Sequence, residues 1–313
     1  MIYAVWIPLL VPFLAVPAAR RLADALSPRR AVRLLTATGA GLALCAVCAL
    51  ALLVVPGAAR LPVVAAAGEF VRPLADAEPA LAVPLAAAAL ALLLGRAATV
   101  TRAARRHWAQ LHRDPGLVDL DDGSELAVLR DARPDAYALP GRPGRPGRIV
   151  VTTGMLQALD PVERDALLAH ERAHLTGRHH LYLVAAELSA RCHPALRALR
   201  APMGYALERC ADEAAAQAVG DRAVAARAIG RAALATRTAG GTAAPRPAPA
   251  LAAAAGPVPR RVAALLGRTA AHPRIGRVAA AALIACLAVS GAAALDATHD
   301  LHSGIETAQG ETP

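Results

Sequence analysis

Two histidines and a glutamate form the most informative spacing in this chain, in the segment His170-Glu171-Arg172-Ala173-His174. Residues four apart on a helix share one face, so both imidazoles could bind the same metal ion. Glu171 follows the first histidine directly and could act as general base toward a water activated by that metal. This arrangement predicts zinc-dependent hydrolysis of peptide bonds. The alternative is a pair of unrelated histidines on the surface of an arginine-rich helix.

A strong helix start upstream favours the metal-site interpretation. Asp160 can cap a helix, Pro161 suits its first position, and Glu163 can complete a capping box. Gly177 stands where such a helix can end. The sequence therefore predicts a helix over 161–176, with the two histidines in its last turns.

A catalytic zinc needs a third protein ligand and an open position for water. Glu208 is the first candidate, because a predicted helix at about 203–218 brings the chain back toward the motif. Asp212, one turn later on the same face, could hydrogen-bond a liganding imidazole and orient it. Both acids could instead be solvated charges on an amphipathic helix. Glu187 is the rival ligand, but it lies in the apolar part of a predicted helix at about 180–199.

The composition indicates membrane-spanning helices rather than one large soluble core. Hydrophobic residues make up 56% of the 313 residues, aromatic residues only 3%, and the mean hydropathy is +0.40. All 34 basic residues are arginines, and they cluster beside apolar segments without interleaved aromatics. The net charge of +10 is therefore better explained by membrane topology than by direct nucleic-acid binding, which we do not expect.

Four apolar segments could span a lipid bilayer, at about 1–18, 34–55, 79–98 and 278–295. Arginines crowd the loop between the first two segments and both flanks of the central region. The positive-inside rule places such regions in the cytoplasm. We therefore expect a multi-pass protein of the plasma membrane, with its N-terminus outside, the motif-bearing domain in the cytoplasm and the C-terminus outside.

The central region has the pattern of a mixed domain. Short apolar runs at 125–130, 135–139 and 148–152 predict strands, and helices follow them. An edge strand of this sheet could hold a peptide by β-addition. The segment 240–259 is rich in alanine, proline and glycine and is expected to be mobile.

The expected fold class is α+β, a mainly α-helical polytopic membrane protein with a zinc protease domain of the gluzincin type. The expected domains are three spans within 1–101, the cytoplasmic peptidase domain over 102–274, and the fourth span with a short extracellular tail over 275–313.

The chain resembles the membrane metallopeptidases of the M56 family, which form the protease half of β-lactam sensor-transducers. The likeness covers most of the chain, from three spans through the His170–His174 segment and Glu208-x-x-x-Asp212 to a fourth span. It implies that His170, His174 and Glu208 bind one zinc ion per chain and that Glu171 activates water. It also implies signal transduction through cleavage of a protein substrate, such as a cytoplasmic transcriptional repressor.

Family M48 is the related alternative, because it shares both motifs and includes HtpX-like proteases of membrane-protein quality control. Three apolar segments before the motif favour M56. Without any lysine the chain has no S-x-x-K acylation site, so we do not expect β-lactam sensing. A non-catalytic membrane sensor or scaffold is the third hypothesis, and Glu171 argues against it because a structural zinc site needs no base.

Overall fold

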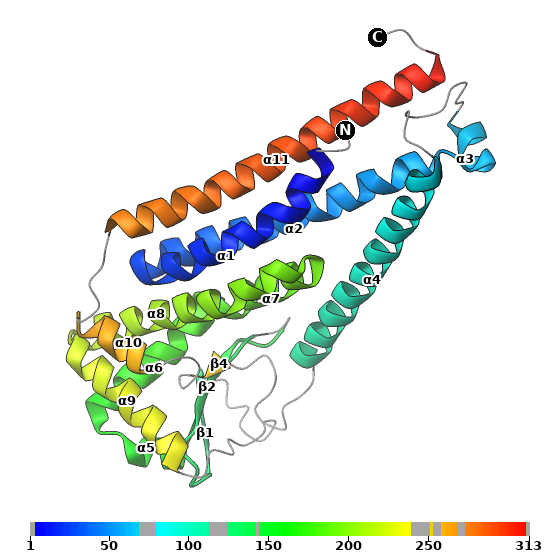
Figure 1. Ribbon diagram of the computed structural model, residues 1–313. Coiled ribbons are helices and arrows are strands. Elements are labelled where there is room, and N and C mark those ends of the chain that lie inside the picture. The colour runs from blue at the N-terminus through cyan, green and yellow to red at the C-terminus, as the bar shows by residue number, and fades with distance from the viewer. Residues whose placement is uncertain are drawn as a thin grey trace.

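The computed structural model describes residues 4–68, 79–112, 124–141, 144–238, 251–252, 258–267 and 273–310. Within these ranges the chain forms a layer of long helices beside a smaller domain, in which further helices surround a short sheet (Figure 1). Most of the described residues are helical, and the sheet lies entirely in the smaller domain.

Among the described residues, four helices are long and apolar enough to cross a membrane. They are α1 (Ile7–Ala25, after the short 3-10 helix η1, Ala4–Trp6), α2 (Pro28–Ala58), α4 (Pro79–His112) and α11 (Pro273–Gln309). Helices α1, α2 and α11 run side by side, whereas α4 meets α2 near the short helix α3 (Pro62–Ala67) and then diverges toward the smaller domain (Figure 1). The four expected spans thus coincide with four helices.

These helices extend well beyond the expected spans. Helices α2, α4 and α11 contain 31, 34 and 37 residues, whereas about 20 residues cross the hydrocarbon core. The expected spans were limited to the apolar segments, but the charged residues that flank these segments, mostly arginines, do not end a helix, because arginine is a good helix former. Close contact between α2 and α4 depends on Gly57, where a Cβ atom would lie 2.8 Å from the Ala82 carbonyl oxygen.

The sheet contains β1 (Leu126–Leu129), β2 (Ala136–Leu139), β3 (Arg148–Thr152) and β4 (Leu251–Ala252), in the spatial order β1-β3-β2-β4. Strand β1 is parallel to β3, and β2 is antiparallel to both β3 and β4. The first three strands confirm the sequence prediction.

Strand β4 falls within the alanine- and proline-rich segment 240–259, where no strand was expected. Its two residues carry no alternating pattern, and they are extended because they pair with Tyr137 and Ala138 of β2. Residues 258–259 begin a helix, and the other positions of the segment lie outside the described residues.

The helices of the smaller domain are α5 (Thr153–Ala158), α6 (Pro161–Thr176), α7 (His179–Cys192), α8 (Arg200–Val219), α9 (Arg222–Thr238) and α10 (Val258–Leu265), with the 3-10 helix η3 (Pro194–Leu199) between α7 and α8. The helix predicted at 161–176 is confirmed. The helix expected at about 180–199 is divided, because His193 is extended before Pro194 and its Nδ1 accepts a hydrogen bond from the Ala195 amide.

One continuous core joins the smaller domain to the long helices. It contains buried residues of α1, α2, η3, α8 and α11, including Leu22, Leu35, Leu196, Leu207 and Leu283. The side chain of Arg209 on α8 also donates hydrogen bonds to the carbonyl groups of Ala23 and Leu26 at the end of α1. Helix α8 is therefore fixed to the layer of long helices.

Candidate metal centre

Helix α6 carries the two histidines, and its first turn is stabilised by a capping box and by an ion pair with α9. Asp160 accepts a hydrogen bond from the Glu163 amide (2.9 Å), and the Glu163 carboxylate accepts one from the Asp160 amide (3.2 Å). This is the capping box that the sequence predicted. Arg231 of α9 forms a further ion pair of 2.7 Å with the buried Glu163. The start of α6 is thereby fixed against α9.

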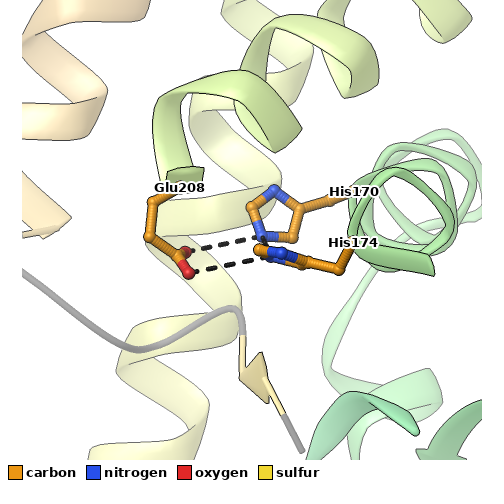
Figure 2. Close-up of side chains that lie close together, drawn as sticks. All are labelled: His170, His174 and Glu208. Carbon is orange, nitrogen blue, oxygen red and sulfur yellow. Dashed lines mark hydrogen bonds and ion pairs between the residues drawn. The ribbon is translucent and has the colours of Figure 1, made fainter. Parts of the chain in front are cut away.

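His170, His174 and Glu208 meet in the interior of the smaller domain, the histidines from α6 and the glutamate from α8 (Figure 2). The two Nε2 atoms lie 3.2 Å apart. The Glu208 oxygens lie 3.6 Å from Nε2 of His170 and 3.7 Å from Nε2 of His174. A tetrahedral zinc with bonds of 2.0–2.1 Å holds its ligand atoms roughly 3.3–3.4 Å apart. The observed spacing fits such an ion.

Each histidine uses its other ring nitrogen to contact a polar side chain. Nδ1 of His170 lies 3.1 Å from Asp212, in the position expected for that carboxylate. Nδ1 of His174 lies 2.7 Å from Nδ1 of His179, the first residue of α7. Burial, together with the nearby His170 and His180, lowers the pKa of His179 to about 4. His179 is therefore neutral near pH 7 and can accept a hydrogen bond from His174.

The turn between α6 and α7 brings His179 to this position. Gly177 ends α6 as predicted, and Arg178 takes the left-handed backbone conformation (φ 49°). A Cβ atom at position 177 would lie 2.6 Å from Nε2 of His179. Gly177 is thus required by the close approach of the His179 ring.

Glu171 lies beside the histidines and is completely buried, with 0% exposure. Within the described part of the chain, neither carboxylate oxygen makes a hydrogen bond of good geometry, and the backbone of Ala138 is the donor that acts on this group. Burial raises the pKa of Glu171 to about 7, although the neighbouring His170 and the backbone of Ala138 on β2 act in the opposite direction. A carboxylate with a pKa near neutrality can both accept and release a proton, as a general base requires.

Arg261 of α10 joins the two acids of α8, and the sequence analysis did not identify it. Its Nη1 lies 2.8 Å from Glu208, and its Nε and Nη2 donate to Asp212 at 2.9 and 2.5 Å. Arg261 is 0% exposed. The sequence did contain an indication of this role. Arg261 shares a helix face with Val258 and Leu265, and an arginine on an apolar face needs buried acids as partners.

Arg261 also sets the charge of the centre. Burial alone would raise the pKa of Asp212, but hydrogen bonds from Arg261 and His170 lower it overall. Burial lowers the pKa of His170, but hydrogen bonds to Asp212 and Glu208 outweigh it and raise the value to about 9. Burial is the largest influence on Glu208 and raises its pKa. The centre therefore holds a negative Asp212 beside a positive Arg261.

The rival ligand Glu187 and two polar residues near the motif, Tyr205 and His193, lie apart from this cluster. Glu187 pairs with Arg191 and Arg200 on the outside of α7 and is not a ligand. The ring of Tyr205 lies under the Arg260 guanidinium, at 4.2 Å. His193 donates from Nε2 to the Leu9 carbonyl. His179, in contrast, contacts the candidate ligand His174 through its Nδ1 atom.

The sequence model of peptidase family M48 matches residues 116–275, a range that contains the sheet, helices α5 to α10 and all the residues of the centre. No curated protein and no solved structure matches the chain. The match is to the family that the sequence analysis ranked second, and the preference for M56 is not confirmed.

Proposed function

The chain belongs to peptidase family M48, a family of zinc metallopeptidases, and on that basis we propose that it is a multi-pass membrane endopeptidase acting at His170, Glu171, His174 and Glu208. The observation that carries the proposal is the close spacing of the three ligand atoms, which one tetrahedral zinc ion could bridge, with the buried carboxylate of Glu171 beside them. A purely structural metal site has no need of that carboxylate, which argues against a non-catalytic sensor or scaffold.

Each side chain has a defined task in peptide hydrolysis. Zinc held by His170, His174 and Glu208 would polarise the scissile carbonyl group and acidify a water molecule. Glu171 takes a proton from the attacking water and passes it to the nitrogen of the leaving amine, which leaves the enzyme unchanged. Asp212 would orient the His170 ring through its contact with Nδ1, the ring nitrogen that does not face the metal.

The outer edge of β2 is the proposed binding strand for the substrate backbone. Leu251 and Ala252 already pair there in antiparallel register with Ala138 and Tyr137. The backbone of Ala138 is also close enough to Glu171 to influence its pKa. A peptide bound by β-addition at this edge would therefore pass the general base in an extended conformation. Substrates should be unfolded or flexible protein segments.

The biological role is inferred from the family rather than from the geometry of the site. Repressor cleavage was implied by the likeness to M56, whereas membership of M48 favours quality control of membrane proteins, as in the HtpX-like members. We propose quality control as the role and regulatory cleavage as the alternative. The arginine-rich flanks of the central region support a peptidase domain on the cytoplasmic side of the plasma membrane.

Comparison of protein N-termini in cells tests both the activity and the role. Cells would express the wild type, Glu171→Gln, or the control Glu213→Gln at equal levels, where Glu213 pairs with Arg222 and belongs to neither proposed site. Zinc content would be measured on each purified protein. New termini that are present in wild type and in the control but absent in Glu171→Gln would support a protease. Many cleaved membrane proteins would support quality control, and one or two targets would support regulation. Identical profiles with zinc still bound would refute the proposal.

A further inference from the structure

A cavity of about 320 Å³ lies between the last turns of α4 and the outer face of α7. Helix α4 lines it with Thr99, Arg102, Arg106 and His107, and α7 lines it with Glu187 and Arg191. The cavity is separate from the metal centre, and the proposed peptidase chemistry does not use its residues.

Positive charge in this cavity exceeds negative charge. Its single carboxylate, Glu187, already forms ion pairs with Arg191 and Arg200. Arg102 and Arg106 form no ion pair with any residue of the described ranges. Nε2 of His107 is buried and has no hydrogen-bond partner within those ranges. The cavity therefore offers two guanidinium groups and a buried ring nitrogen to an anion with several acceptor oxygens.

The cavity lies where α4 is expected to leave the hydrocarbon core. At 1.5 Å per residue, the 34 residues of α4 extend about 51 Å, whereas the core is about 30 Å thick. The apolar part of α4 ends before Arg96, and the cavity residues follow in the next turns. Trp108 is 63% exposed on the same turns, as is common at the interface between lipid and water.

The apolar surface next to the cavity decides between a lipid and a soluble anion. Leu85 and Leu92 precede Thr99 and Arg106 of the cavity at intervals of seven residues, so they share the same face of α4, and they are 37% and 50% exposed. They give acyl chains an apolar surface on the cavity side of α4. A free phosphate ion has the same headgroup chemistry but gains nothing from these leucines.

We propose that this cavity binds the phosphate headgroup of an anionic membrane lipid in the leaflet nearest the peptidase domain, with Arg102 and Arg106 as its principal ligands. Arginine forks match phosphate oxygens geometrically, and basic pockets between membrane helices are suited to such headgroups. The lipid would connect α4 to α7, whose first residue, His179, contacts the ligand His174. Binding itself does not require peptidase activity, so the two proposals can fail separately.

The test uses the purified, delipidated full-length chain in a neutral detergent, with its thermal stability and bound lipid measured by melting curves and native mass spectrometry. Phosphatidylglycerol, phosphatidylcholine and inorganic phosphate are titrated separately. We expect binding and stabilisation by phosphatidylglycerol alone. Arg102→Gln/Arg106→Gln should weaken that binding by roughly 10- to 30-fold, from the contribution of each arginine near an anionic headgroup.

The control is Arg274→Gln/Arg277→Gln, which removes the same charge from two exposed positions at the start of α11. It should bind phosphatidylglycerol like the wild type. Equal weakening in both double variants would indicate a general surface-charge effect and overturn the proposal. Equal stabilisation by phosphatidylcholine or by inorganic phosphate would also overturn it, because the site would then not select an anionic lipid.

Discussion

Replacement of Arg261 by methionine tests how strongly the metal centre depends on a buried cation. Methionine has a similar length but no charge, so Glu208 and Asp212 would lose the ion pairs of 2.8 and 2.5 Å that Arg261 now makes. Removal of one partner of a buried ion pair typically costs about 3–5 kcal/mol, since the remaining charge stays buried without compensation. Here two carboxylates lose the same partner.

The expected effect on the metal-free protein is large. With roughly 2–4 °C per kcal/mol for domains of 150–250 residues, a loss of 3–5 kcal/mol lowers Tm by roughly 6–20 °C. In the variant both buried carboxyl groups should take up protons more readily, because burial then raises their pKa without opposition from Arg261. The difference in Tm from wild type should therefore become smaller as the pH falls from 8 to 5.

The assay is a thermal melt of the full-length protein in detergent with a chelator present, at pH 8 and at pH 5. Arg260→Met is the matched control, because Arg260 precedes Arg261 on α10 but is exposed and pairs with Asp24 at the surface. Surface pairs contribute about 0–1 kcal/mol, so the control should melt within a few degrees of wild type. A Tm of Arg261→Met within 2 °C of that control would refute the reasoning.

Three further predictions concern the histidines. Zinc binding must displace the proton that His170 holds with a pKa of about 9. Zinc affinity, measured by calorimetry, should therefore rise roughly tenfold per pH unit between pH 7 and 9. An affinity that does not change with pH would contradict this prediction. His179→Ala removes the contact to His174 and should weaken zinc binding by about 10- to 100-fold in a chelator competition, with no change expected if His179 only fills space. Gly177→Ala places a Cβ atom against the His179 ring and should weaken zinc binding in the same direction, whereas wild-type affinity would show that the ring can move without consequence.

The features that follow from local sequence were predicted well. The capping box and the pairing of His170 with His174 on one face of α6 depend on residues only three or four positions apart. The four apolar segments were also predicted, because a helix that can cross a membrane contains about 20 mostly apolar residues in succession. The ends of these helices were not predicted, since a helix can continue beyond its apolar segment without a change in its backbone.

Features that depend on distant residues were harder to predict. Glu208 was predicted as a ligand from its residue type and from the predicted helix that returns the chain toward the motif. Its actual position beside His170 comes from the packing of α8 on α6. The contact between Arg261 and Asp212 spans 49 positions and crosses from α10 to α8. Strand β4 exists only through its partner β2. Such contacts are set by tertiary packing, and no short-range pattern encodes them.

The pairing of Leu251 and Ala252 with β2 has a consequence for substrate choice. A segment tethered to its own domain competes at an effective concentration on the order of millimolar, so a dilute soluble peptide would rarely displace it from the edge. A protein embedded in the same bilayer is confined to a thin layer and reaches a comparable local concentration. If substrates bind at the edge of β2 as proposed, this competition within the chain should favour substrates that share the membrane with the enzyme.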